Sequence, residues 1–506
     1  MATFSLAMDL GMGQPLEWVM RTCLLGVHLG KSLGLSDEEC RQVYYISLLQ
    51  HIGCTSAASW QAELFGNELS MGQVLTLDTK NPLEAFPTII KLAGQDQPLM
   101  ARARYLGRAL AAGPNAKDEL SQIQCEVAGN LASRLSFATD ILQVLGQVFE
   151  RWDGQGQPNH IQGEDLALPI RVIHLAHDAA TIELQTDAET AVNVIQKRSG
   201  KLYDPNVADS FLSQASDLFK KLNVDSTWDA ILDAEPEPAI WLTEAQFEDA
   251  LLAIADFTDL KSPYFVGHSR AVAKLAEATA QNYGLPESDA TMLRRTGLIH
   301  DFGRVGVSSS IWNKEGRLNE SEWERVRLHP YLTERILVRS KTLAPLMNLA
   351  ILHQERLDGS GYHRRLSGSM LSINGRILAA VDAYQAMLEP RPHRPALSPK
   401  EAAAELRQDA GAGKFDPNIV DAVLRAAGHQ IQKPRQSAPG GLSKREIEVL
   451  RLLARGLSNP EIGEKLVISK KTVGHHVQHI YNKIDVSTRA GATLFAMQNN
   501  LINTLQ

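Results

Sequence analysis

The sequence predicts an all-α protein made of two tandem helical bundles and a small C-terminal helical domain. Apolar residues recur at positions i, i+3 and i+4 through long segments, for example residues 271–283 and 322–338, while strand-like alternation is scarce. A chain of 506 residues is also too long for one hydrophobic core. Several helical domains are therefore expected.

Two segments rich in helix-breaking residues divide the chain. Glu235 to Pro238 interrupts helical periodicity near the middle, and residues 433–441 carry two prolines and two glycines. We therefore predict domains over residues 1–235 and 240–430, a linker over 431–441 and a final domain over 442–506.

The two larger domains resemble each other. Residues 34–53 match residues 284–303 at a shift of 250, and residues 149–156 match 354–361 at a shift of 205. The difference predicts an insertion in the first copy, around Leu69 to Gln97. Two matches in the same order indicate duplication, and chance similarity between helices is the alternative.

Composition and charge restrict the function classes. Four cysteines without a Cys-x-x-Cys pair argue against disulfides and structural zinc. The N-terminus lacks signal-peptide features and no apolar run is long enough to span a membrane, so we expect a cytoplasmic protein with no membrane partner. The net charge is −7, but residues 440–506 contain nine Lys and Arg against five Asp and Glu. This segment therefore has a net charge of +4, and the rest of the chain has −11. Such a distribution is expected if only the C-terminal segment contacts the phosphates of nucleic acid.

The second copy contains a constellation of imidazoles and carboxylates in helical context. An adjacent His-Asp pair after an apolar run is its most specific part. These groups are ligands for divalent transition metals, and a carboxylate can bridge two ions that hold hydroxide and clamp a phosphodiester. The candidate ligands are His268, His300, Asp301, His329, His353 and Asp382.

In order and spacing these residues resemble the HD superfamily, specifically its HD-GYP branch, over roughly residues 247–397. The resemblance implies a helical bundle with iron or manganese that hydrolyses cyclic di-GMP. It implies one metal on His268, His300, Asp301 and Asp382, and a second on Asp301, His329 and His353. It gives Asp301 and Arg304 catalytic roles, and it places Arg304, Gly359, Gly361 and Tyr362 beside the ligand.

Four residues depart from the family pattern. Tyr264 and Gln354 stand where the family has metal-binding glutamates, Arg304 replaces a lysine, and His363 replaces the proline of the GYP motif. Two ions are therefore expected rather than three. Catalysis, metal binding without catalysis, and a metal-free scaffold all stay open.

The first copy lacks the ligand set. Its aligned residues are Trp18, Gln50, His51, Gln124, Val148 and His177. Trp and Val cannot ligate a metal, and no carboxylate remains to bridge two ions. The first copy is thus expected to serve packing, dimerisation or ligand sensing.

The tail carries a helix-turn-helix pattern. Ser443 and Glu446 form a capping box, a turn over residues 456–459 precedes a short helix, and Ser469 caps a longer helix that reaches about Ile484. A helix, a tight turn and a polar-faced helix can enter the DNA major groove. The candidate DNA contacts on that face are Lys470, Lys471, Thr472, His475, Gln478 and Lys483.

This tail resembles the LuxR/GerE family over residues 442–501, with Gly474 and His475 as departures. The resemblance implies a four-helix domain that binds double-stranded DNA. Because one such helix reads few base pairs, a homodimer is expected. The sequence thus predicts a transcription regulator whose body binds divalent metal and a phosphorylated or cyclic nucleotide. The alternatives are an active cyclic di-GMP-type phosphodiesterase tethered to DNA, and a metal-free dimerisation scaffold.

Overall fold

A computed structural model describes residues 1–78, 81–95, 97–111, 115–430, 442–484, 486–499 and 501. Regular structure in these ranges is helical, with only isolated β-bridges, so the all-α prediction is confirmed. The chain divides into two compact units, Met1–Gly428 and His429–Gln506. The predicted linker 431–441 lies outside the described residues, and the boundary at residues 235–240 stays a prediction. None of the described helices is both long and apolar enough to cross a bilayer.

The first half of the larger unit begins with α1 and ends with α12. The helices, including the short 3-10 helices η1 to η3, are α1 (Ala2–Gly11), α2 (Trp18–Ser32), α3 (Asp37–Leu49), η1 (Cys54–Ala57), α4 (Ala58–Phe65), η2 (Glu68–Val74), α5 (Pro82–Leu92), α6 (Leu99–Ala111), α7 (Asn115–Arg134), α8 (Thr139–Leu145), η3 (Gly163–Asp165), α9 (Leu168–Gln185), α10 (Ala188–Arg198), α11 (Pro205–Lys220) and α12 (Thr227–Asp233). The predicted insertion thus contains most of η2 and all of α5.

The second half repeats this order from α13 onward. Its helices are α13 (Glu244–Asp259), α14 (His268–Tyr283), α15 (Glu287–Ile299), η4 (Phe302–Gly306), α16 (Ser309–Trp312), α17 (Glu320–Arg327), α18 (His329–Leu337), α19 (Ala344–Ala350), η5 (Gly368–Met370), α20 (Ile373–Leu388), α21 (Pro399–Gly411) and α22 (Pro417–Ala426). Helix α2 packs on α3 and α9, as α14 packs on α15 and α20.

Glycines at equivalent positions support the duplication. A Cβ on Gly53 would lie 2.0 Å from the Gln124 oxygen, and one on Gly303 would lie 2.2 Å from the His329 oxygen. These four residues align at the shifts of 250 and 205 that the sequence predicted. Both copies therefore need the same close backbone approach after the third bundle helix.

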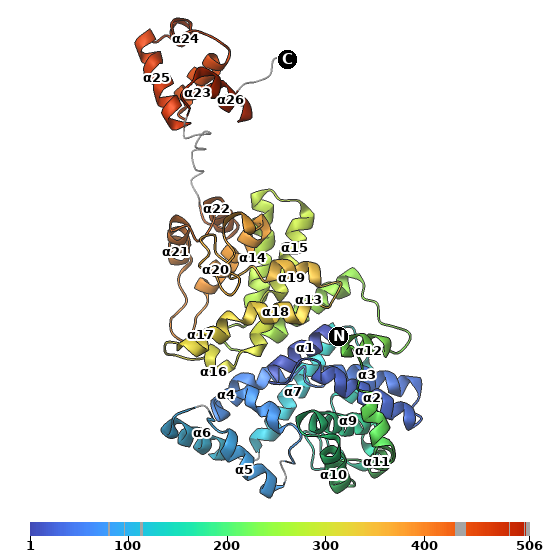
Figure 1. Ribbon diagram of the computed structural model, residues 1–506. Coiled ribbons are helices and arrows are strands. Elements are labelled where there is room, and N and C mark those ends of the chain that lie inside the picture. Colours follow the sequence, from blue (N-terminus) through green and yellow to red (C-terminus); the bar gives the residue numbers. More distant parts are fainter. Residues whose placement is uncertain are drawn as a thin grey trace. The chain divides into compact units, whose positions relative to one another are not determined.

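The two halves pack reciprocally. Helix α1 packs on η4 of the second half, and α13 packs on η1 of the first. In Figure 1, α1 and α4 of the first half lie next to α18 and α16 of the second. Phe4 contacts both Phe257 and Phe302 edge-on, at centroid distances of 4.8 and 5.7 Å. Each half thus completes part of the other's core, with α4 against α16 between them.

A buried ion pair also joins the halves. The Lys261 Nζ lies 2.8 Å from the Glu68 Oε1, with both side chains at most 1 % exposed. Glu68 also accepts hydrogen bonds from Ser308 Oγ and from the Ser309 backbone N–H. Burial alone would raise the pKa of Glu68, but the Lys261 charge and these hydrogen bonds outweigh it and lower that pKa. The Glu68 carboxylate is therefore ionised.

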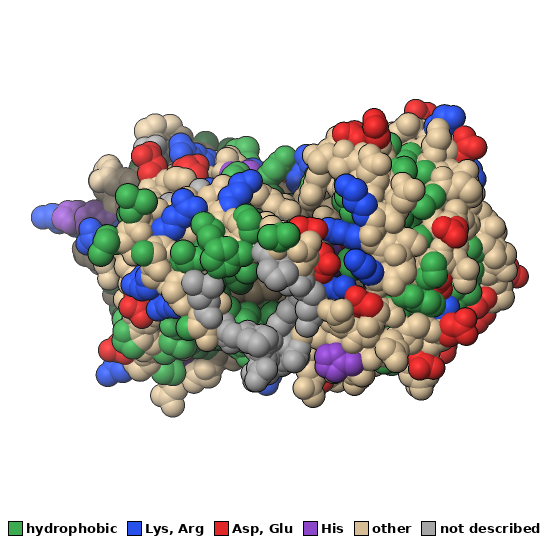
Figure 2. Space-filling model, turned by 90° about the horizontal axis from the view of Figure 1, so that it is seen from below, with side chains coloured by type: hydrophobic (Ala, Val, Ile, Leu, Met, Phe, Trp, Pro, Cys, Tyr) green, Lys and Arg blue, Asp and Glu red, His purple; other side chains and the backbone are tan. Residues whose placement is uncertain are grey.

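The outer surface of the larger unit is mixed in character. On the face shown in Figure 2, acidic and basic side chains are interspersed with hydrophobic ones. No single-sign field of the kind that attracts nucleic acid is evident on that face.

The smaller unit contains α23 (Lys444–Ala454), α24 (Asn459–Leu466), α25 (Lys470–Lys483) and α26 (Arg489–Gln498). The predicted capping box of Ser443 and Glu446 is present, and Ser458 and Glu461 form a second one. Ser469 caps α25 as predicted. Val449, Leu450, Ile462, Val473 and Ile480 form the core.

Candidate functional site

The six candidate ligands come together in the second copy. His268 begins α14, His329 begins α18, Asp382 lies within α20, and each is at most 2 % exposed. His300, Asp301 and His353 follow the ends of α15 and α19 and are fully buried. Four helix ends and the interior of α20 thus converge on one point.

The imidazole rings are oriented by their Nδ1 atoms. The Nδ1 of His300, His329 and His353 lies 2.8, 2.6 and 2.7 Å from the backbone oxygens of Gly297, Val326 and Ala350. A carbonyl only accepts, so each Nδ1 carries the proton and each Nε2 presents a lone pair to the centre. Metal-bound histidines are typically held in this way.

Asp301 divides the cluster into two groups. Its Oδ2 lies 3.0 Å from His300 Nε2 and 3.3 Å from His268 Nε2, and Asp382 Oδ1 lies 3.1 Å from the latter. Its Oδ1 lies 3.3 and 3.2 Å from the Nε2 atoms of His329 and His353. Among the described residues, groups of three or more potential metal ligands occur here and share Asp301.

The geometry fits a cation in the second group. The Nε2 atoms of His329 and His353 face each other at 2.9 Å, although both rings are protonated at Nδ1. Two lone pairs at this distance repel unless a positive charge lies between or beside them. Both Asp301 oxygens are buried without a well-formed hydrogen bond, which is the condition of a carboxylate that serves a metal.

The electrostatics of the cluster are coupled. Burial would lower the pKa of His268, but hydrogen bonds to Asp301, Asp382 and Glu389 hold it well above its ordinary value. Burial likewise opposes protonation of His300, yet Asp301 and Asp382 raise its pKa to about 9. The pKa values of both aspartates are held well below normal. Protons on His268 and His300, together with the Arg304 charge, thus offset the carboxylates, whereas burial lowers the pKa of His353 to about 4 and leaves that ring neutral.

Arg304 lies at the edge of this cluster. Its NH2 is 2.7 Å from Asp301 Oδ2, and its guanidinium stands 4.4 Å from the Phe265 ring centroid and 5.8 Å from that of Trp312. Its Nε and NH1 are buried without a hydrogen-bond partner. The Arg304 guanidinium, which Phe265 and Trp312 keep in place, thus has two N–H donors available for an anionic ligand.

The structure places three of the departures from the family pattern, and one of them, Gln354, has a side-chain role. Gln354 Nε2 donates to Asp382 Oδ2 at 2.7 Å, so the amide orients a neighbouring carboxylate. The backbone oxygen of Tyr264 accepts from Arg391. His363 lies near Tyr331, with ring centroids 6.1 Å apart.

Two residues of the site were missed by the sequence analysis. Glu389 accepts from His268 Nδ1 at 2.9 Å, and Arg391 lies 2.9 Å from Glu389. Glu389 follows Asp382 by seven residues, which is two helical turns. That spacing was the available signal, because it places Glu389, the residue that directly follows α20, near the side of the helix that carries Asp382.

The predicted ligand loop is shaped by its glycines. Gly359 has φ 78°, and a Cβ on Gly361 would lie 2.6 Å from the Glu355 Cα. Tyr362 lies edge-on to His329 at 5.9 Å. The loop therefore borders the cluster through Tyr362, while the glycines set its path.

The aligned residues of the first copy also converge, without metal-ligand chemistry. Trp18 stacks on His51 at 5.0 Å and meets His177 at 5.3 Å. Gly154 and Gly156 repeat the φ and the close approach of Gly359 and Gly361.

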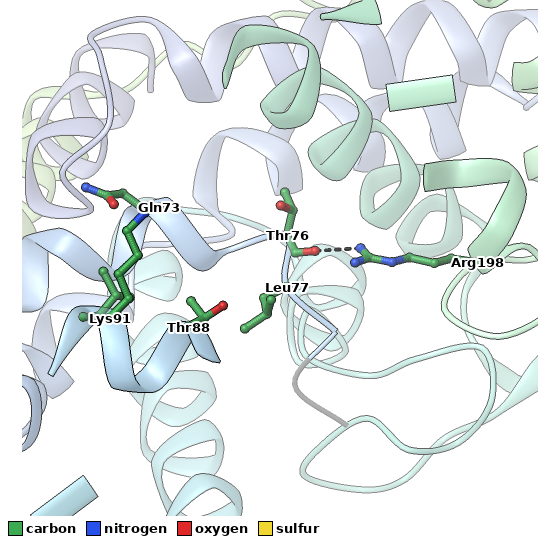
Figure 3. Close-up of a pocket in the computed structure, with 7 residues that line it drawn as sticks. Gln73, Thr76, Leu77, Thr88, Lys91 and Arg198 are labelled. Carbon is green, nitrogen blue, oxygen red and sulfur yellow. Dashed lines mark hydrogen bonds between the residues drawn. The ribbon is translucent and has the colours of Figure 1, made fainter. Parts of the chain in front are cut away.

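A separate cavity of about 280 Å³ lies beside the insertion (Figure 3). Arg198 NH1 donates to the Thr76 backbone oxygen at 2.6 Å across it. Its lining contains no imidazole and no carboxylate, so it offers no metal site.

The candidate DNA contacts share the exposed face of α25. Lys470, Lys471, Thr472, His475 and Gln478 are all exposed. Lys483, at the end of the helix, lies 2.7 Å from Glu446. All six side chains are thus exposed, and Lys483 is also paired with Glu446 inside the domain.

Comparison with known families agrees with this architecture. The HD domain model matches residues 107–207 and 253–419, and the model of bacterial regulatory proteins of the luxR family matches residues 441–496. The chain belongs to the HD domain family. Its C-terminal domain is of the luxR type.

Similar proteins include phosphodiesterases of cyclic dinucleotides. The 3'3'-cGAMP-specific phosphodiesterase 3 of Vibrio cholerae is 30% identical over 430 residues, which are 84% of this chain and 93% of that protein. A crystal structure of a cyclic GMP-AMP-specific phosphodiesterase of V. cholerae matches with a TM-score of 0.58 and 27% identity, over 85% of this chain and 97% of that one. A cyclic di-GMP phosphodiesterase of Pseudomonas aeruginosa is 32% identical over 166 residues, 33% of this chain and 40% of that protein.

Proposed function

We propose that this protein is a DNA-binding transcription regulator whose second HD copy holds two divalent transition-metal ions and binds a cyclic dinucleotide. The observation that carries the metal is the 2.9 Å approach of two Nε2 lone pairs, on His329 and His353. The shared Asp301 would bridge the two ions. Mixed imidazole and carboxylate ligands suit iron or manganese.

The ligand would be anchored by Arg304. Phe265 and Trp312 hold its guanidinium, and its unpartnered Nε and NH1 can donate to a phosphate oxygen. Tyr362 borders the same space. The similar phosphodiesterases act on cyclic dinucleotides, which carry two such phosphates.

Hydrolysis is the second candidate activity, favoured by the same free donors of Arg304. Bound metal ions would supply an activated hydroxide and a Lewis acid. Arg304 would hold the phosphate and offset its charge, and Gln354 would keep Asp382 oriented.

The test is metal analysis of protein purified at low oxygen, followed by incubation with 3'3'-cGAMP and with cyclic di-GMP. We expect about two ions per chain and saturable binding of one dinucleotide. A linear product would show that the regulator is also a phosphodiesterase. Protein without metal under these conditions would contradict the proposal.

DNA binding is tested with the C-terminal unit and the full chain on promoter fragments. Affinity should fall steeply with salt, because Lys470 and Lys471 displace counterions. Alanine at Lys471 and Thr472 should weaken binding by about 1–3 kcal/mol if either side chain reads a base edge. Sedimentation with and without DNA tests the expected homodimer.

A further inference from the structure

The first copy contains a cavity at the position of the second copy's cluster. The cavity is about 210 Å³, and Gln50, His51, Val148 and His177 line it. These four residues align with His300, Asp301, His353 and Asp382. The first copy therefore has a cavity at the position that the candidate metal ligands occupy in the second copy.

Three nitrogen atoms in this lining have no partner. They are the Nε2 atoms of Gln50, His51 and His177, whose residues are 7, 8 and 9% exposed. Buried polar atoms nearly always find hydrogen bonds in folded proteins. Three orphaned atoms around one cavity indicate that the cavity receives a polar molecule.

The hydrogen-bonding character of these atoms can be assigned. His177 Nδ1 lies 2.8 Å from Asp178 Oδ1, and Asp178 accepts a further bond from Tyr203. Because the carboxylate accepts, His177 carries its proton on Nδ1 and its Nε2 is an acceptor. The Gln50 Nε2 is a donor. The cavity thus presents a donor and an acceptor together.

The charged groups of the lining are already engaged. Arg151 pairs with Asp78 at 2.9 Å and with Asp153 at 2.7 Å. The Glu150 carboxylate accepts two backbone N–H groups. Burial holds the pKa of His51 well below its ordinary value, so this ring is neutral. An anion would find no free cation, which favours a neutral ligand.

Size and shape favour a flat ring. A cavity of about 150 Å³ accepts benzene, so this one admits a somewhat larger ring system. The His51 ring, which stacks on Trp18 with an interplanar angle of 24°, and Phe149 both line it. We propose that the first copy binds a nucleobase, free or as a nucleoside, through Gln50 and His177. The proposal does not depend on metal in the second copy.

The test is calorimetric titration of adenosine, guanosine and their free bases into the full chain. The protein carries Asp301→Ala and is treated with chelator, so that the second copy's site is disabled. One of these compounds should bind. Gln50→Leu should weaken that binding about tenfold, the equivalent of one hydrogen bond. The matched control, Gln408→Leu at an exposed position of α21, should bind as before.

Thermal unfolding separates this role from a structural one. Removing a buried amide nitrogen without a partner should leave the Gln50→Leu protein at least as stable as its parent, although its binding is about tenfold weaker. His177→Phe, which places an apolar ring in the cavity, should also abolish binding. The proposal is overturned if none of the four compounds binds, if Gln50→Leu binds equally well, or if inorganic phosphate competes.

Discussion

The two HD copies share a backbone but differ in what fills the centre. In both, a tight loop depends on paired glycines, Gly154 and Gly156 in one and Gly359 and Gly361 in the other. In the second copy the centre contains six buried potential metal ligands, namely Asp301 and five residues around it. In the first, Trp18 stands where His268 does, and its indole donates to Thr181. The fold thus requires the glycines and helix contacts, and tolerates the loss of every ligand.

The largest contrast between the copies should be metal content. Asp301→Ala removes the carboxylate that both ligand groups share, so we expect all bound metal to be lost. His51→Ala, at the aligned position of the first copy, should leave the metal content unchanged. Elemental analysis measures both, and circular dichroism checks that each variant is folded. Metal loss from the His51 variant would show that the metal site lies in the first copy, contrary to the proposal.

The second largest effect should come from the Glu68–Lys261 ion pair between the copies, which contributes to folding stability. Glu68→Ala leaves Lys261 buried and uncompensated, which should lower the free energy of unfolding by about 3–5 kcal/mol. Glu324→Ala, which breaks an exposed pair with Arg327, should change it by less than about 0.5 kcal/mol. Urea unfolding measures both values.

A double variant sharpens this prediction. Replacing both partners, Glu68→Leu with Lys261→Met, should recover most of the lost stability, because no charge is then buried alone. Stability that stays low in the double variant would show that the contacts of Glu68 with Ser308 and Ser309 matter more than the ion pair.

The shared loop predicts equal responses in the two copies. A Cβ on Gly156 would lie 2.3 Å from the Glu150 Cα, and one on Gly361 would lie 2.6 Å from the Glu355 Cα. Alanine at either position should lower the free energy of unfolding by about 1–3 kcal/mol. Gly107→Ala in α6, where nothing lies within 4 Å, should instead stabilise by about 0.5–1 kcal/mol. A response from only one copy would break the proposed equivalence.

The smallest effect concerns the C-terminal unit, which has no counterpart in the duplicated body. Burial would raise the pKa of Glu446, but Lys483 and Ser443 lower it from 4.5 to about 2. A lowered pKa stabilises the fold above pH 4.5, and this contribution is lost as the pH falls toward 2. The unfolding temperature of this unit should therefore fall as the pH drops from 4.5 toward 2, and this fall should be smaller in the Glu446→Gln variant.

Local patterns in the sequence predicted much of this molecule. The capping box at Ser443 and the helix cap at Ser469 each depend on residues at most three positions away, so the local sequence was enough to predict them. The cluster of His and Asp side chains was predictable because its residues keep the order of a known family. Its division around Asp301 required the positions of the side chains.

Features built from distant residues were not predicted. Glu68 and Lys261 are 193 positions apart, and neither is unusual in its local sequence. The Phe265 and Trp312 rings beside Arg304 come from segments that carry no recognisable motif. Gln354 was predicted as a lost ligand, but its hydrogen bond to Asp382 depends on a rotamer that sequence does not encode.

The reciprocal packing of α1 on η4 and of α13 on η1 has the symmetry of a dimer interface, although both partners belong to one chain. In a homodimer any substitution appears on both sides of the twofold axis, so both centres change together. Fusion removes that restriction, and it also makes association independent of protein concentration. The two centres of one chain can therefore differ: the first contains a cavity and no carboxylate at the aligned positions, and the second contains the buried His and Asp cluster.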